Sequence, residues 1–216
     1  MKITVFGATG GVGRLVVRQA LDAGHEVTAV VRDPARLPVP AHPRLHVATV
    51  RDVTDPGPLF HVVAGHDAVI SALGAAGNKQ AKASPIAEPA LRAIVKAMEA
   101  AGVRRLAAVS AAPVGPVPDG DSALTRTVVF PILRRLLRDL YADLAGMEEA
   151  IRASATEWTV VRPPMLLDRP HTGRYRRALD ANVAGGKTIA RADVADALLT
   201  SIEDPSTVGH VLGVAK

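Results

Sequence analysis

Short runs of apolar residues alternate along the chain with longer stretches whose apolar positions recur at helical spacing. The runs are rich in Val, Ile and Ala and are apolar on both faces, which is typical of central strands in a parallel sheet covered by helices. The predicted strands are Lys2–Phe6, Glu26–Val31, Arg44–Val50, Ala68–Ala72, Arg105–Ser110 and Trp158–Arg162. This alternation predicts an α/β fold, a doubly wound parallel sheet with helices on both faces.

The helical stretches fall between these strands. They are predicted at Gly11–Ala23, Pro58–Ala64, Ile86–Ala101, Thr125–Ala153 and Ala192–Glu203. Ser84 followed by Pro85 is the usual pair at an N-cap and first helical position, so it predicts where the third helix begins. Pro131 is expected to kink or interrupt the long fourth helix, because proline removes a backbone donor.

The chain is expected to form one domain over residues 1–216, since its length fits a single core and no linker separates two. The segment 111–122 carries three prolines and two glycines and is predicted to be a loop after a strand. Beyond Arg162 the pattern becomes irregular. Residues 163–190 are expected to form a small elaboration on the substrate side. Short strands are expected at Gly173–Leu179 and, beyond this segment, at His210–Ala215.

Composition narrows the function classes. Hydrophobic residues make up 48% of the chain and charged residues 22%, as in globular proteins. There is no cysteine, which excludes a disulfide framework and a thiol nucleophile. The seven histidines lack metal-ligand spacing, so no metal is expected. With no signal-peptide pattern and no apolar run of about 18 residues, a cytoplasmic protein without a membrane partner is predicted.

The formal net charge is +5, but only 3% of residues are aromatic and most arginines alternate with acids. Nucleic-acid binders usually show clustered basic residues with aromatic platforms, so we expect no nucleic-acid partner. An anionic cofactor makes equal use of positive charge. The sequence leaves the oligomeric state open.

A glycine cluster joins the first predicted strand to the first predicted helix. Gly7, Gly10 and Gly13 are spaced G-x-x-G-x-x-G, with Thr9, Gly11 and Val12 between them. Glycines there let the backbone turn tightly and approach a pyrophosphate, while the helix N-terminus favours its negative charge. This segment therefore predicts a dinucleotide-binding loop in a Rossmann-type domain.

Two residues after the second strand compete to decide which dinucleotide binds. An acidic residue here accepts from the ribose hydroxyls of NAD, whereas an arginine accommodates the 2′-phosphate of NADP. Asp33 precedes Pro34, the pattern of a short helical turn, so Asp33 already has a structural role. Arg32 is free to reach the phosphate, and NADP(H) is preferred over NAD(H). A solvated Arg32 at the strand end is the alternative.

Three segments together carry a family resemblance: Gly7–Gly13, Val31–Pro34 and Trp158–Pro163. The chain resembles the atypical short-chain dehydrogenase/reductases. Within these it is similar to the NAD(P)H-binding group that includes the biliverdin reductase B or flavin reductase type and the NmrA-like regulators. The resemblance implies NADPH-dependent hydride transfer to a small, planar, conjugated acceptor such as a flavin, quinone or tetrapyrrole.

The remaining candidate residues follow the carboxyl ends of the strands, where ligands of such sheets lie. The resemblance places Asp52 and Val53 at the adenine, although a turn-forming Asp52 is the alternative. A backbone of small residues could approach the ribose and pyrophosphate at Ala72, Leu73 and Gly74. Ser110 is expected to hydrogen-bond the nicotinamide or the acceptor, unless it merely closes a strand. The segment after the sixth strand, Pro163, Pro164 and Met165, is expected to close over the nicotinamide end of the cofactor.

The sequence departs from the family pattern at one important position. Short-chain dehydrogenases usually carry Tyr-x-x-x-Lys, whose lysine makes the tyrosine a general acid. Here Tyr141 is followed four residues later by Ala145, so Tyr141 is expected to pack against the sheet. Flavins and quinones accept hydride into a conjugated system and can take the proton from solvent, so a reductase of such acceptors is compatible with the missing Tyr-Lys pair. A non-catalytic, NADP(H)-sensing regulator fits it too.

Overall fold

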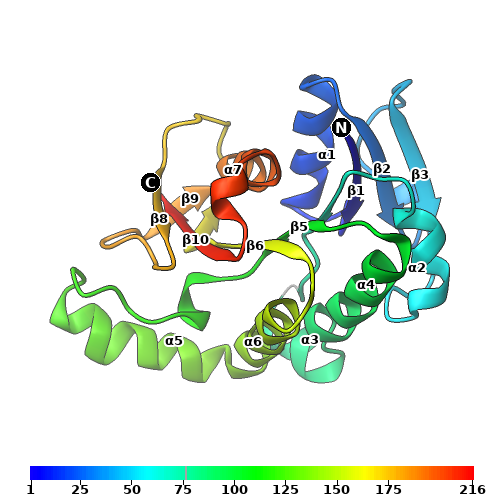
Figure 1. Cartoon of the computed structure of the whole chain (residues 1–216). Coiled ribbons are helices and arrows are strands. Elements are labelled where there is room, and N and C mark those ends of the chain that lie inside the picture. Colours follow the sequence, from blue (N-terminus) through cyan, green and yellow to red (C-terminus); the bar gives the residue numbers. More distant parts are fainter. Residues whose placement is uncertain (76) are drawn as a thin grey trace.

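The computed structural model describes residues 1–75 and 77–216, and eight of its strands form one central sheet (Figure 1). Their order across the sheet is β3 (Leu45–Thr49), β2 (Glu26–Val31), β1 (Lys2–Phe6), β4 (Ala68–Ser71), β5 (Arg105–Val109), β6 (Glu157–Arg162), β10 (His210–Ala215) and β8 (Arg176–Leu179). Neighbours pair parallel except β8, which runs antiparallel to β10. Because β1 lies between β2 and β4, the strand order reverses there, and such a switch point opens a crevice for ligands.

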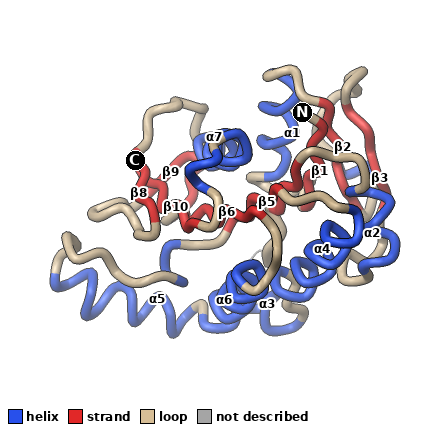
Figure 2. Tube along the Cα trace, in the orientation of Figure 1, coloured by secondary structure: helices blue, strands red, loops and turns tan. Residues whose placement is uncertain are grey.

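Helices cover both faces of the sheet (Figure 2). On one face lie α1 (Gly13–Asp22) and α7 (Arg191–Glu203), and on the other α2 (Pro56–Val63), α4 (Ala87–Ala101) and α6 (Arg138–Arg152). Each face holds its own buried cluster. Val5 of β1 packs with α1 and α7, whereas the next residue, Phe6, packs with α2, α4 and α6. The predicted fold class is therefore confirmed.

The start of α4 differs from the prediction. Ser84 ends the short helix α3 (Asn78–Ala83), which the sequence pattern did not indicate. The cap of α4 comes from Asp143 on α6, which is 5% exposed and accepts from the backbone N–H groups of Ile86, Ala87 and Glu88 at 3.0, 3.0 and 2.9 Å. A carboxylate from a neighbouring helix thus replaces the local serine cap.

The predicted helix Thr125–Ala153 is also wrong as one element. A π-helical turn at Thr125–Val129 leads into α5 (Phe130–Leu136). The helix is interrupted at Leu137, which has φ −110° and ψ 31°, before α6 begins. Pro131 directly follows the π-helical turn and Phe130 and lies six residues before Leu137, so the break at Leu137 is not at the proline. None of the residues of α5 is buried.

Strand β3 was expected to be covered on both sides but lies at the edge of the sheet, with Val47 45% exposed. Beyond β6, the segment 163–190 forms β7 (Met165–Leu167), β9 (Thr188–Ala190) and the edge strand β8; β7 and β9 pair in a second small sheet. The strand predicted at Gly173–Leu179 is shorter, spanning Arg176–Leu179. Across residues 1–75 and 77–216, no helix is long and apolar enough to cross a membrane.

Candidate cofactor site

The glycine loop after β1 is too tightly packed for side chains at two positions. Gly7 has φ +75°, and a Cβ on it would lie 2.5 Å from the carbonyl oxygen of Ala72 after β4. A Cβ on Gly13 would lie 2.1 Å from the carbonyl oxygen of Gly7. Between them, Gly10 N–H donates to Gly7 O at 2.9 Å, which closes the turn. The loop therefore has the geometry that lets a backbone cradle a pyrophosphate.

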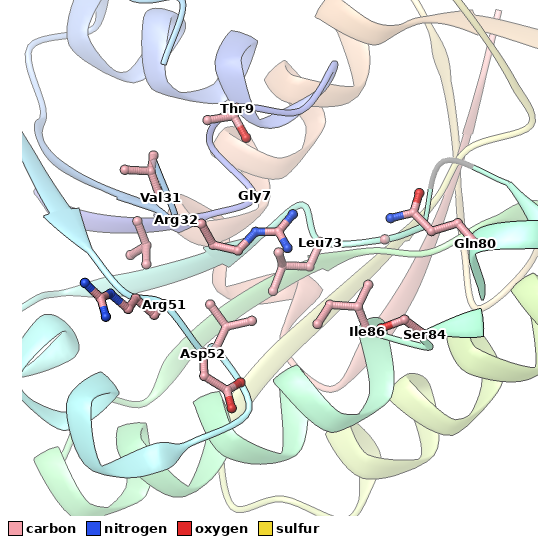
Figure 3. A pocket seen from close by; sticks show the side chains of 13 residues that line it. Gly7, Thr9, Val31, Arg32, Arg51, Asp52, Leu73, Gln80, Ser84 and Ile86 are labelled. Atoms are coloured by element: carbon pink, nitrogen blue, oxygen red, sulfur yellow. The ribbon is translucent and has the colours of Figure 1, made fainter. Parts of the chain in front are cut away.

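A cleft of about 220 Å³ opens beside this loop at the switch point of the sheet (Figure 3). The residues that line it come from the ends of β1, β2 and β4, from the segment after β3, and from α3 and the turn before α4. They are Gly7, Thr9, Val30, Val31, Arg32, Arg51, Asp52, Val53, Leu73, Gly74, Gln80, Ser84 and Ile86.

Arg32 and Asp33 differ in their surroundings: Asp33 caps a turn, whereas Arg32 lines the cleft. The Asp33 carboxylate accepts from Ala35 N–H at 3.0 Å and caps the 3-10 turn Pro34–Arg36, which confirms its structural role. The Arg32 side chain lines the cleft, with its guanidinium directed toward Leu73 (Figure 3). A second cation, Arg51, also lines the cleft and was not predicted. It could have been noticed, because it directly precedes Asp52 at the end of a strand.

Asp52 forms a turn, which was the alternative to an adenine contact. Its Oδ1 accepts from the backbone N–H of Thr54 at 2.8 Å and from the Thr54 hydroxyl at 2.6 Å. These two hydrogen bonds lower the pKa of Asp52. Figure 3 shows the carboxylate pointing away from Arg32. Asp52 and Val53 both line the cleft, so the turn still shapes its wall.

The other candidate residues lie in the glycine loop or follow the ends of β4, β5 and β6. Gly10, Gly11, Val12 and Gly13 form the loop and the start of α1, and Ala72 lies against Gly7. Ser110 follows β5, while Pro163, Pro164 and Met165 follow β6. Pro164 lines a separate small hollow of about 10 Å³ with Arg162, and Met165 is 63% exposed. The structure thus brings the expected loop and adenosine-side residues together and leaves Ser110 and the Pro163–Met165 segment outside this cleft.

Ser110 belongs to a buried ionic network that sequence reasoning missed. Its hydroxyl donates to Glu148 Oε1 of α6 at 2.6 Å, and Arg162 Nε donates to the same oxygen at 2.8 Å. Arg162 Nη2 and Arg152 Nη2 donate to the other oxygen, Oε2. Ser110, Glu148 and Arg162 are 7%, 0% and 6% exposed. Glu148 and Arg152 are four residues apart on α6, but Ser110 and Arg162 meet them only when α6 packs on the sheet, so no local pattern signals the network.

The charges in this network decide the ionisation of Glu148. Burial alone would raise the pKa of Glu148, but hydrogen bonds from Arg162 and Ser110 and the charges of Arg162 and Arg152 outweigh it, so the pKa is lowered. Glu148 is therefore a carboxylate at neutral pH and can only accept hydrogen bonds. Since the single hydroxyl proton of Ser110 is directed at it, Ser110 offers lone pairs to any further partner.

Tyr141 does not have the features of a general acid. It is half-buried on α6 and packs against the core cluster on that face of the sheet. Burial raises its pKa above the ordinary value for tyrosine. The residue four positions later is Ala145, which offers no cation to reverse that shift.

Comparison with known proteins agrees with this geometry. Residues 7–205 match a protein family described as NAD(P)H-binding. The uncharacterised protein YwnB of Bacillus subtilis is 28% identical, over 95% of this chain and 93% of its own. In structure, SP1627 of Streptococcus pneumoniae, assigned by inference as an NADH-flavin reductase, has a TM-score of 0.79 at 24% identity, covering 100% of this chain and 99% of its own. A short-chain dehydrogenase/reductase of Veillonella parvula, solved with NADP, has a TM-score of 0.79 at 21% identity, covering 100% of this chain and 94% of its own.

Proposed function

We propose that this chain, which belongs to the NAD(P)H-binding family, is an NADPH-dependent oxidoreductase that transfers hydride to a planar conjugated acceptor such as a flavin or quinone. The observation that carries the cofactor preference is Arg32, whose side chain lines the cleft beside the glycine loop while Asp33 is held by the turn that it caps. An arginine at this strand end suits a 2′-phosphate, whereas the alternative acid is already engaged.

The cleft and the loop fit a dinucleotide in two parts. Backbone N–H groups of the glycine loop and the first turn of α1 would hold the pyrophosphate, and the close packing at Gly7 and Gly13, which has no room for a Cβ, keeps the loop in its tight turn. Arg32 and Arg51 would hold the 2′-phosphate, and Val53 and Leu73 supply apolar walls for the adenosine. The nicotinamide supplies the hydride when it is bound.

The protein's own contribution to the reaction is positioning. Ser110 lies at the carboxyl end of β5, and its orientation is fixed by Glu148, so it would accept a hydrogen bond from a ligand N–H. Neither Ser110, whose proton is committed, nor Tyr141, whose pKa is raised, is suited to donate a proton. An acceptor whose conjugated system takes the hydride and whose proton comes from water suits such a site.

The same observations favour one second candidate, an NADP(H)-sensing regulator without turnover. A site with a committed serine and a poorly acidic tyrosine could bind the dinucleotide and catalyse nothing. The two functions differ in a single respect, because only the reductase oxidises NADPH when an acceptor is added.

The test is NADPH oxidation by the purified protein with FMN, riboflavin and a small quinone, with NADH in parallel. The reductase predicts turnover with at least one acceptor and a higher kcat/KM for NADPH than for NADH. Tight NADPH binding by titration without turnover on these acceptors would support the sensor instead. Failure to bind either dinucleotide would contradict both.

A further inference from the structure

Arg191, the first residue of α7, lies against the glycine loop. Its Cδ and Nε are each 3.0 Å from the position that a Cβ on Gly11 would occupy. Glycine at position 11 therefore leaves room for the arginine side chain. The arginine comes from far along the sequence and was not among the candidates that the sequence indicated.

The packing of two helices brings Arg191 to the loop. Helix α1 follows β1, and α7 runs back before β10, which is parallel to β6, so both helices begin at the carboxyl edge of the sheet. They pack against each other on one face, and Gln19 Nε2 donates to the carbonyl oxygen of Ala192 at 2.9 Å. The base of the Arg191 side chain is thus fixed relative to α1.

Arg191 forms an ion pair with a carboxylate on the protein surface. Arg191 Nη1 lies 2.8 Å from Asp168 Oδ1, and the Asp168 side chain is 76% exposed. An ion pair with so exposed a carboxylate is screened by water and contributes little stability. The Arg191 side chain is 28% exposed, so part of it remains accessible to solvent.

We propose that Arg191 is a further cofactor-binding residue, which exchanges the Asp168 carboxylate for the pyrophosphate of the dinucleotide. This rests on the proposed function, since it requires a dinucleotide at the glycine loop. A pyrophosphate carries more charge than one carboxylate, and the planar guanidinium fork suits its oxygens. At this edge its charge would also be favoured by the N-terminus of α1. Asp168 acts as the competitor that holds Arg191 before the cofactor arrives.

The experiment uses two ligands that differ in the pyrophosphate. Binding of 2′-phospho-ADP-ribose, which carries it, and of 2′-AMP, which lacks it, is measured by calorimetry on the full chain. The variants are Arg191→Ala, Asp168→Asn and the two combined. Thermal unfolding of each variant checks that it folds.

Arg191→Ala is expected to weaken binding of 2′-phospho-ADP-ribose by about tenfold or more and to leave 2′-AMP within about twofold. Asp168→Asn is expected to tighten binding of 2′-phospho-ADP-ribose by about two- to fivefold, because it removes the competitor. That gain should disappear when Arg191 is also replaced. A purely structural role for the ion pair would instead make both single variants weaken both ligands.

Two outcomes would overturn the proposal. Unchanged affinity for 2′-phospho-ADP-ribose in a folded Arg191→Ala variant would show that the arginine does not reach the pyrophosphate. An equal loss for both ligands would show that it supports the fold of the loop only. If the unchanged protein binds neither 2′-phospho-ADP-ribose nor ADP-ribose, the proposed function itself fails, which is a different result from failure of the Arg191 variant alone.

Discussion

The hydroxyl of Ser110, at the point where β5 ends, donates a hydrogen bond of 2.6 Å to Glu148 Oε1. Arg162 and Arg152 hold Glu148 as a carboxylate, which can only accept a hydrogen bond from the serine and cannot donate one to it. Ser110 is thereby fixed as a hydrogen-bond acceptor. The hydrogen bond from Ser110 to Glu148 therefore connects the buried ionic network to the role proposed for Ser110 in binding a ligand N–H.

Ser110→Ala is expected to slow turnover more than it weakens NADPH binding. One neutral hydrogen bond contributes about 1 kcal/mol, so kcat should fall by roughly five- to tenfold while the Kd for NADPH stays within about twofold. Steady-state kinetics and a binding titration measure the two effects. Ser154→Ala is the control, since Ser154 lies just beyond the end of α6 and its hydroxyl donates to the carbonyl oxygen of Ile151, and it should change neither value. An equal loss in binding, or no effect at all, would argue against the role given to Ser110.

Glu148→Gln is expected to destabilise the fold strongly. The substitution keeps the volume but removes the negative charge beside Arg162, which is only 6% exposed. Breaking a buried ion pair by removing one partner costs about 3 kcal/mol or more. Unfolding in urea measures the loss, and Glu149→Gln, on the exposed side of the same helix, is the matched control. Equal midpoints for the two variants would show that the network contributes no stability.

The same carboxylate predicts how stability depends on pH. The folded state lowers the pKa of Glu148 below its ordinary value of 4.5, so the folded state favours the charged form. Its contribution is therefore complete above about pH 4.5 and is lost as the pH falls toward the lowered folded-state pKa. The difference in unfolding free energy between the unchanged protein and Glu148→Gln should narrow through this acid range. A difference that stays constant down to acid unfolding would refute this assignment.

The features that could be predicted from the sequence are those encoded by neighbouring residues. The glycine loop, Arg32 in the cleft and the Asp33 cap depend on contiguous segments, and the local pattern of turn and strand residues identifies them. The alternation of strands and helices likewise predicted the central sheet, because the periods of apolar residues are local. These features placed the cleft beside the glycine loop.

What could not be predicted comes from contacts between distant segments. Glu148 meets Ser110, and Arg191 meets the glycine loop, only because α6 and α7 pack as they do, and nothing near Glu148 or Arg191 in sequence marks them. Asp143 took over the cap that Ser84 was expected to form for the same reason. The break at Leu137 could not be predicted from Pro131, because the proline lies just after the π-helical turn and six residues before the break.

Asp143→Ala is expected to loosen the start of α4. Asp143 satisfies three backbone N–H groups at once in a buried position, so its removal leaves unpaired donors and should cost about 1–3 kcal/mol. Hydrogen exchange at Ile86, Ala87 and Glu88 should rise, together with a lower urea midpoint. Asp143→Asn keeps an acceptor and should lose less. Unchanged exchange at these three amides in the alanine variant would rule out the cap.

Arg32→Ala is expected to remove the preference for NADPH over NADH. A charge-assisted hydrogen bond to a 2′-phosphate is worth about 1.5–3 kcal/mol, so NADPH affinity should fall by roughly 10- to 100-fold, whereas NADH, which lacks that phosphate, should bind almost as before. Arg51→Ala should act in the same direction if both cations share the phosphate. Arg36→Ala, on the turn capped by Asp33, is a charge-matched control, because Arg36 does not appear among the described residues that line the cleft. Titrations of each variant with both dinucleotides give the ratio directly. An Arg32 variant that weakens NADH as much as NADPH would assign Arg32 to the shape of the cleft and leave the cofactor preference without its main support.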